Sequence, residues 1–169
     1  MNRTRSEYRL RSLGDLPARR ELDARRPVDA DRTVLAELML DAYRDTIDDE
    51  GEDLDDALAA IDHYLAIIHR EQSLVVEHDG APVAACFVLS VDDTLYIDPV
   101  IVAKRHQRSG LGGRLVLAVL HGLASGNTEE PTQVGATITD GNEPSERLFA
   151  RLGFERVGAW PPTEPPSDG

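Results

Sequence analysis

The residues best suited to chemistry lie in one basic stretch, residues 102–115, with the sequence VAKRHQRSGLGGRL. Gly110 and Gly112 allow the backbone to turn tightly before an amphipathic helix, so that successive N–H groups point inward at the helix start. Those donors and the positive end of the helix dipole form an anion site suited to a pyrophosphate. Three cations beside the glycines would attract a polyanion: Lys104, Arg105 and Arg108.

Two common phosphate-binding motifs are absent from this stretch. A G-x-G-x-x-G fingerprint would need a third glycine where Leu115 stands, and a P-loop would need a lysine after the glycines, whereas Lys104 precedes them. For the glycine pair taken alone, a plain structural turn remains the alternative. The five histidines show no zinc-binding spacing, so we expect no metal.

Hydrophobic periodicity predicts the elements that position this stretch. We expect two amphipathic helices that form an αα-hairpin, three strands, a third helix, a strand, a short helix and a last strand. The expected ranges are helices from 31 and 54, strands 74–78, 83–89 and 95–102, a helix over 111–123, a strand over 133–139, a helix from 142 and a strand from 154. Weak alternation over residues 8–13 predicts a further strand at a sheet edge. This order indicates an α+β or mixed α/β domain.

Length and composition limit the class of protein. A chain of 169 residues suits a single domain, and its net charge of −13 argues against nucleic acid as a partner. No apolar stretch approaches the roughly 20 residues of a membrane span. Cys86 is the one cysteine, so no internal disulfide can form. We therefore expect a soluble, cytoplasmic protein that acts neither on nucleic acid nor at a membrane.

The charge is distributed unevenly along the chain. Residues 1–27 hold eight Arg and four acidic residues, whereas residues 28–60 hold two Arg and twelve acidic residues. Residues 99–128, which include the basic stretch, contain no acidic residue. We expect one domain over residues 1–169, with a core at about 28–158, an Arg-rich N-terminal extension at 1–27 and a Pro-rich flexible tail at 159–169.

Two motifs together resemble those of the GNAT acetyltransferase superfamily. Residues 107–112, QRSGLG, match its Q/R-x-x-G-x-G/A signature. Residues 142–154, NEPSERLFARLGF, resemble its second motif, N-x-x-A-x-x-L-Y-x-x-x-G-F. The resemblance covers residues 28–158. It implies a central, mostly antiparallel sheet flanked by helices, with a splayed pair of strands that binds acyl-CoA.

The resemblance also implies an activity: transfer of an acetyl group from acetyl-CoA to a primary amine of a small molecule or peptide, by direct attack in a ternary complex. The matching positions carry over as follows. Ile101 and Val102 would give backbone contacts to the pantetheine arm, Asn142 and Phe149 would lie near it, and the diphosphate would bind at Gln107, Arg108, Ser109, Gly110, Leu111 and Gly112. The resemblance further allows a homodimer, because many relatives pair through sheet edges or tails.

Two departures from the family pattern concern catalysis. Phe149 replaces the tyrosine that protonates the departing thiolate, so that proton would come from Ser145 or a water. Some family members carry a glutamate at the position that Tyr96 occupies here. Asp98 lies two residues further along the chain, hence on the same strand face. We expect Asp98 to be the general base. The alternative is that Asp98 begins a turn before Pro99.

The acceptor is the least defined part of this prediction. In such folds the connection between the first two helices borders the acceptor site, and here it carries Asp48, Glu50 and Glu52, which would attract a cationic amine. A solvated surface loop is the alternative. Two other functions also fit the resemblance: a non-catalytic acyl-CoA-binding module, which Phe149 would tolerate, and an enzyme that uses another donor such as succinyl- or propionyl-CoA.

Overall fold

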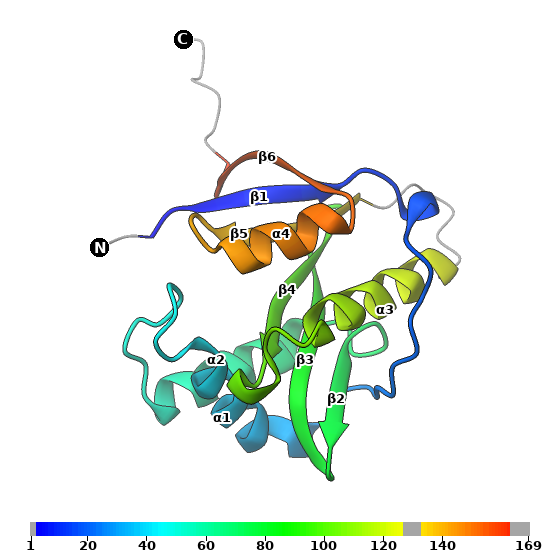
Figure 1. Ribbon diagram of the computed structural model, residues 1–169. Coiled ribbons are helices and arrows are strands. Elements are labelled where there is room, and N and C mark those ends of the chain that lie inside the picture. The colour runs from blue at the N-terminus through cyan, green and yellow to red at the C-terminus, as the bar shows by residue number, and fades with distance from the viewer. Residues whose placement is uncertain (1–2, 127–132, 163–169) are drawn as a thin grey trace.

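The computed structural model describes residues 3–126 and 133–162 and is built around a six-stranded sheet (Figure 1). The strand order is β2-β3-β4-β5-β1-β6. The strands are β1 (Arg5–Leu10), β2 (Leu74–His78), β3 (Ala81–Val91), β4 (Thr94–Val102), β5 (Gln133–Thr139) and β6 (Phe154–Trp160). Neighbouring strands are antiparallel except β4 and β5, which are parallel. The predicted mixed, mostly antiparallel fold is confirmed.

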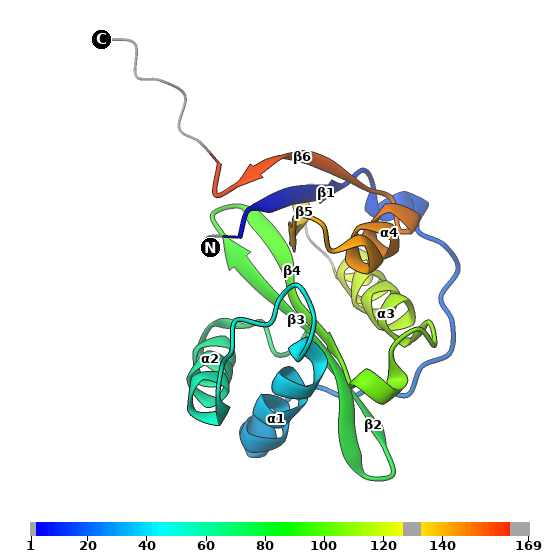
Figure 2. The ribbon, with the colours of Figure 1, turned by 60° about the vertical axis from the view of Figure 1, so that its left-hand side comes forward.

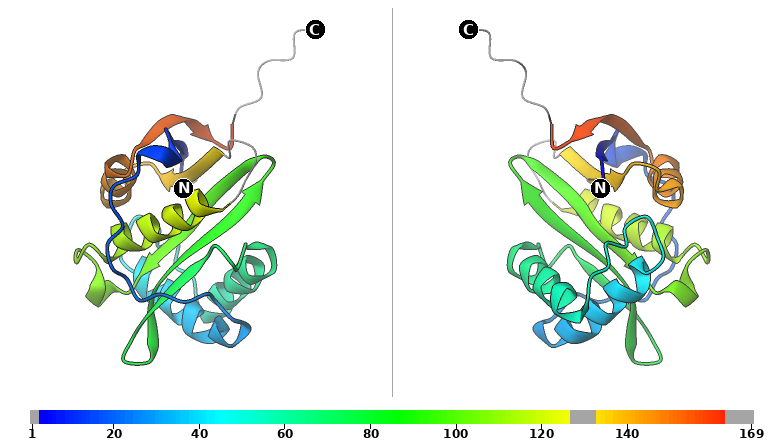
Figure 3. Two further views of the ribbon diagram at one scale, coloured as in Figure 1. Left: turned by 90° about the vertical axis from the view of Figure 1, so that its right-hand side faces the viewer. Right: turned by 90° about the vertical axis from the view of Figure 1, so that its left-hand side faces the viewer.

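Helices cover both faces of the sheet (Figure 2). The hairpin of α1 (Arg32–Tyr43) and α2 (Leu54–Ile67) lies on one face, and α3 (Leu111–Ser125) and α4 (Glu143–Arg151) lie on the other. Short 3-10 turns occur at η1 (Leu13–Asp15), η2 (Asp29–Asp31) and η3 (Lys104–His106). Figure 3 shows the two edge strands, β2 and β6, at opposite ends of the molecule.

Local sequence explains where the helices begin and what they bury. Asp53 accepts a hydrogen bond from the Asp56 N–H in a capping box that starts α2. Leu115 and Leu120 of α3 are fully buried against one face of the sheet, and Leu35 of α1 is fully buried against the other. The parallel step from β4 to β5 needs a crossover, which α3 provides. Within the described residues, no helix is both long and apolar enough to cross a membrane.

The position of β1 corrects the sequence-based prediction. An edge strand over residues 8–13 was expected, whereas β1 spans Arg5–Leu10 and lies inside the sheet, between β5 and β6. It pairs Arg5 with Thr139 on one side and Leu10 with Phe154 on the other. The N-terminal residues thus complete the interior of the sheet. Local alternation could not reveal this, because both partner strands lie near the other end of the chain.

The two ends of the predicted domain also differ in detail from the expectation. Arg25, in the expected N-terminal extension, forms an isolated antiparallel bridge with Val75 of β2. Ala159 and Trp160, in the expected tail, belong to β6. Residues 163–169 of that tail lie outside the described residues.

The fold predicts the effect of adding one methyl group to β5. Gly135 lies opposite Tyr96, and a Cβ atom there would lie 2.9 Å from Tyr96 Cε1 and 3.3 Å from the Tyr8 carbonyl oxygen. Gly135→Ala should therefore lower the free energy of unfolding, measured in urea, by about 1–3 kcal/mol. Gly113→Ala in α3 is the matched control, because a Cβ there meets nothing within 4 Å. It should raise stability by up to about 1 kcal/mol; equal stability of the two variants would contradict this packing.

Candidate active site

Strands β4 and β5 pair only over residues 94–96 of β4 and then separate. Between its pairings with Cys86 and Val88, β4 has one residue more than β3, which is a β-bulge that includes Asp98 and Pro99. Beyond the bulge β4 pairs with β3 alone, and the end of β5 pairs with β1 alone. Along the described residues, no strand pairs with the facing edges of β4 and β5, so the backbone groups there that no side chain bonds are available to a ligand.

A cleft of about 1290 Å³ opens where the strands separate, and we call it the central cleft. Residues of α1, α2, β4, α3 and α4 line it, together with Arg5 and Arg20 from the N-terminal part of the chain. Most predicted site residues line the central cleft; those that do not are Tyr96, Ile101, Ser109 and two of the predicted cations, Lys104 and Arg105. A smaller hollow of about 690 Å³, beside His69 and Ser90, lies apart from these residues.

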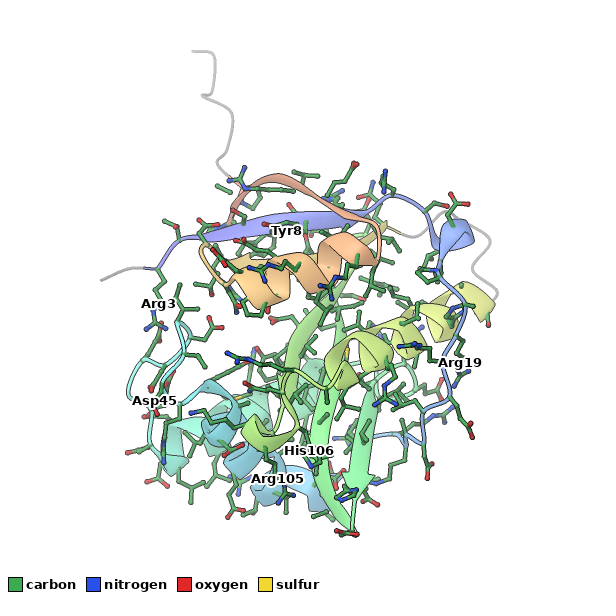
Figure 4. The ribbon with its side chains drawn as sticks, viewed as in Figure 1. Arg3, Tyr8, Arg19, Asp45, Arg105 and His106 are labelled. Atoms are coloured by element: carbon green, nitrogen blue, oxygen red, sulfur yellow. The ribbon has the colours of Figure 1, made fainter. Side chains whose placement is uncertain are left out.

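The predicted anion-binding stretch forms the wall of the central cleft at the start of α3. Figure 4 labels Arg105 and His106 in η3, the turn that precedes it. Arg108 and Gly110 adopt left-handed backbone conformations, with φ of 63° and 80°, so the chain turns sharply into the helix. No described side chain caps α3, and its first turn holds no acidic residue. The N–H groups of that turn can therefore bind an anion.

Two side chains of this loop serve mainly to hold it in place. Gln107 Nε2 donates hydrogen bonds to the carbonyl oxygens of Val102, at 3.0 Å, and Ala42, at 3.3 Å. Ser109 Oγ donates to the carbonyl oxygen of His106. These contacts join the loop to the end of β4 and to α1. Ile101 is also turned away from the cleft, because its side chain is fully packed in the core.

Asp98 lies in the bulge with its side chain 24% exposed, in the lining of the central cleft. Burial raises the pKa of this carboxyl group above its usual value. The charge of Arg5, whose nitrogen lies 3.9 Å from the carboxylate, opposes that increase, as does a hydrogen bond from the Tyr64 hydroxyl. The nearby Asp48 carboxylate raises the pKa further. Such a group accepts a proton more readily than an exposed aspartate does.

Sequence reasoning missed the residues that surround Asp98. Arg5 comes from β1, where it donates a hydrogen bond to the Thr137 carbonyl oxygen at 3.3 Å; among the described residues its buried Nε has no partner. Tyr43 and Tyr64 line the central cleft from α1 and α2, and burial raises the pKa of both hydroxyls. Tyrosines on adjacent helices of an aromatic-poor chain were a usable sequence signal, but nothing local indicated Arg5.

The structure does not bring Tyr96 to the other predicted site residues. Its hydroxyl donates to Glu7 Oε1 at 2.6 Å, and its ring centroid lies 5.2 Å from that of Trp160. Burial and the Glu7 carboxylate raise the pKa of Tyr96 to about 12. The physical reason is that β4 still pairs with β5 at this residue, so the strands have not yet separated. Tyr96 instead links β4 to β1 and β6.

Asp48 joins the α1–α2 connection to the start of α4. Its Oδ1 accepts a hydrogen bond from Thr139 Oγ1 at 2.6 Å, and its Oδ2 accepts one from Asn142 Nδ2 at 3.0 Å. Asn142 Oδ1 in turn accepts from the Ser145 N–H at 3.3 Å, as the predicted helix cap requires. Glu50, by contrast, is exposed in the lining of the cleft.

Phe149 occupies a mostly apolar position in the wall of the central cleft. Its side chain is buried and packs edge-on against Phe154, with ring centroids 5.0 Å apart. Among the described residues, no group of three or more His, Cys, Asp or Glu side chains could hold a metal ion.

Comparisons with known proteins place these features in a family context. The model of the acetyltransferase (GNAT) family matches residues 33–154, which is more than half of the chain. A sequence comparison with curated proteins found no match.

Several solved structures share the fold. An acetyltransferase of the GNAT family from Colwellia psychrerythraea aligns with 13% identity and a TM-score of 0.70, over 94% of this chain and 54% of that chain. A GCN5-related N-acetyltransferase from Sphaerobacter thermophilus aligns with 16% identity and a TM-score of 0.68, over 93% of this chain and 49% of that one. This chain thus spans about half the length of both proteins.

A third structure is similar along most of its own length. AAC(6')-Iy, solved in complex with the bisubstrate analog CoA-S-monomethyl-acetylneamine, aligns with 16% identity and a TM-score of 0.57, over 80% of this chain and 92% of that chain. At such low identities, these structural similarities establish the fold alone.

The raised pKa of Asp98 predicts a pH-dependent stability. An acid whose pKa is raised on folding stabilises the protein fully below its unfolded pKa, here 3.8, and this contribution is lost as pH rises through the folded pKa. In urea titrations, Asp98→Asn should therefore gain stability relative to the wild type as pH rises from below 3.8 to 7.

Asp140 provides a control of opposite sign. Hydrogen bonds from Ser6 and Thr4 lower its pKa, so its contribution is present above the unfolded pKa and is lost as pH falls through the folded pKa. Asp140→Asn should lose stability relative to the wild type over the same rise in pH. A stability difference for Asp98→Asn that does not change with pH would contradict the buried environment of that carboxylate.

Proposed function

Because this chain belongs to the GNAT acetyltransferase family, we propose that it transfers the acetyl group of acetyl-CoA to a primary amine of a small molecule or peptide, by direct attack in a ternary complex. The observation that carries this proposal is the separation of β4 from β5. One cleft thus contains the start of α3, which has no side-chain cap and no acidic residue and so suits a diphosphate. The same cleft contains the partly buried carboxylate of Asp98, which suits a proton acceptor.

The donor is assigned to the α3 side of the central cleft. The diphosphate would bind at the loop that precedes α3, where Arg108 and Gly110 turn the backbone N–H groups inward. The unpaired edge of β4 at Ile101 and Val102 would hydrogen-bond the pantetheine arm through the backbone. The complex of AAC(6')-Iy with an analog that contains CoA supports this assignment by analogy of fold.

The reaction needs a neutral amine and a stable leaving group. Asp98 accepts one proton from the substrate ammonium group, and the free amine nitrogen then attacks the thioester carbonyl carbon. The C–S bond breaks, and the nitrogen loses its second excess proton to the departing thiolate, directly or through water. The products are the amide and the thiol of CoA, and Asp98 returns its proton to solvent.

Phe149 affects only the last proton transfer. It cannot donate a proton, but a thiol has an ordinary pKa near 8.5, so the thiolate is a tolerable leaving group near neutral pH. The Ser145 side chain lines the central cleft at the start of α4 and is the candidate donor in its place.

The acceptor is assigned to the side of the cleft lined by the α1–α2 connection. Glu50 is exposed there and free to attract a cationic amine, whereas both oxygens of Asp48 already accept hydrogen bonds from Thr139 and Asn142. We therefore propose that Glu50 attracts the acceptor and that Asp48 shapes its site.

Release of the CoA thiol, measured with a panel of primary amines, tests this function. Asp98→Asn should lower turnover by about 10²–10⁴-fold, and should remove the part of the pH–rate profile that rises as the carboxyl group ionises. Asp62→Asn, which alters an exposed carboxylate on α2 that pairs with Arg32, is the control and should leave both unchanged. An unchanged profile would exclude Asp98 as the base. Acetyl-CoA binding without thiol release from any amine would favour a non-catalytic module.

A second substitution tests the position of Phe149. Phe149→Tyr adds a hydroxyl group in the wall of the central cleft and should maintain or raise turnover, measured by the same thiol release. Phe154→Tyr is the matched control, because Phe154 packs on the same ring but is not among the residues that line the cleft. It should not raise turnover. A large loss of activity in Phe149→Tyr, with thermal stability retained, would contradict the proposed position of the leaving group.

A further inference from the structure

Arginines from α3, from α4 and from the segment that follows β1 line the central cleft. Arg20, Arg114 and Arg151 all line it, and within the described residues none of the three side chains forms an ion pair or a hydrogen bond. Other arginines of the protein do pair, such as Arg25 with Asp31 and Arg32 with Asp62. Arg44 and Arg108 line the cleft without such a partner too, but Arg44 follows α1 in the acidic connection and Arg108 belongs to the loop assigned to the diphosphate. The other three, in a chain with a net charge of −13, indicate a further anionic group on the ligand.

Three separate segments bring these arginines to the same cleft. Arg114 belongs to the N-terminal part of α3, and Arg151 is the last residue of α4. Arg20 belongs to the segment that runs from β1 past α3, where Figure 4 labels its neighbour Arg19. The Pro17 carbonyl oxygen holds that segment to α3 by accepting a hydrogen bond from His121 Nε2 at 2.8 Å.

Arg114 follows the loop assigned to the diphosphate, whereas Arg20 and Arg151 come from segments outside that loop. Pro17, Leu117 and Leu152, each within three residues of one of these arginines in the sequence, also line the cleft. From Leu111 the α3 axis rises about 4.5 Å to Arg114 and about 9 Å to Leu117, at 1.5 Å per residue. One ribose with its phosphate arms covers a span of that order. If the diphosphate of a nucleotide lies at the helix start, a further phosphate on its ribose would lie farther along the same cleft. Arg20, Arg114 and Arg151 line that cleft.

We propose that Arg20, Arg114 and Arg151 form a second anion subsite of the central cleft, and that this subsite holds the 3′-phosphate of CoA. The inference rests on the proposed donor, because CoA carries a 3′-phosphate in addition to its diphosphate. Guanidinium groups suit this task, since their planar N–H donors can bind two phosphate oxygens at once. The N-terminal segment that contains Arg20 thereby becomes part of the donor site.

Dephospho-CoA provides a direct test, because it differs from CoA only in the missing 3′-phosphate. Calorimetric titration of the wild-type protein should show CoA binding about 10- to 100-fold more tightly than dephospho-CoA, the range expected for one charge-assisted contact. In the double variant Arg20→Gln/Arg151→Gln, the two affinities should come within about 3-fold of each other. The affinity for dephospho-CoA itself should not change, which also shows that the variant is folded.

Two control variants match the altered residues. Arg19→Gln changes the neighbour of Arg20 in the same segment, and Arg147→Gln changes an arginine of α4 that pairs with Glu143. Neither residue lines the central cleft, so both variants should keep the preference for CoA.

The outcomes separate this inference from the proposed function. Equal affinities of the wild-type protein for CoA and dephospho-CoA would overturn the subsite while leaving the donor assignment intact. A preference for CoA that persists in the double variant would also overturn it. Failure of the wild-type protein to bind either compound would overturn the proposed function together with the subsite.

Discussion

Strand β4 does not pair with both β3 and β5 along its whole length, and the rest of the site depends on this constraint. It pairs with β3 along its length, but the bulge at Asp98 and Pro99 turns it away from β5. The sheet stays continuous because β4 and β5 still pair over residues 94–96; beyond that point β4 pairs with β3 and β5 pairs with β1. The core also stays closed on both sides of the opening, through Leu35 on one face and Leu115 on the other. The opening is therefore a stable part of the fold.

Acidic and basic side chains are separated in space as well as along the chain. The acidic α1–α2 connection and the basic loop before α3 meet at Lys104, whose Nζ lies 3.5 Å from Asp45 Oδ2 and donates to the Arg44 carbonyl oxygen at 2.7 Å. Arg3, labelled beside this connection in Figure 4, donates to the Asp49 carbonyl oxygen from the other direction. The central cleft thus has an acidic rim near Asp98 and a cationic wall along α3. Opposite charges can therefore approach it from opposite sides.

Features of the fold and the site that depend on contacts between residues close in sequence were predictable, whereas those that depend on distant residues were not. The loop at Gly110 and the cap at Asn142 were predicted because glycine conformation and helix capping depend on neighbouring residues. The inner position of β1 and the burial of Tyr96 were not, because both depend on pairing with strands distant in sequence. The three arginines of the proposed second anion subsite were not predicted. Arg114 lies in the acid-free window of the sequence, but Arg20 and Arg151 reach the cleft through tertiary packing.

The place of β1 between β5 and β6 also constrains the order in which the chain can fold. Arg5 pairs with Thr139, and Leu10 pairs with Phe154, so β1 has no partners until β5 and β6, residues 133–160, have been synthesised. The region from α1 to β4 is linked by contacts much closer in sequence and can assemble earlier. Closing the long loop to β1 costs chain entropy, although this cost grows only slowly with loop length. The central cleft therefore becomes complete late in folding, when the first strand joins the last two.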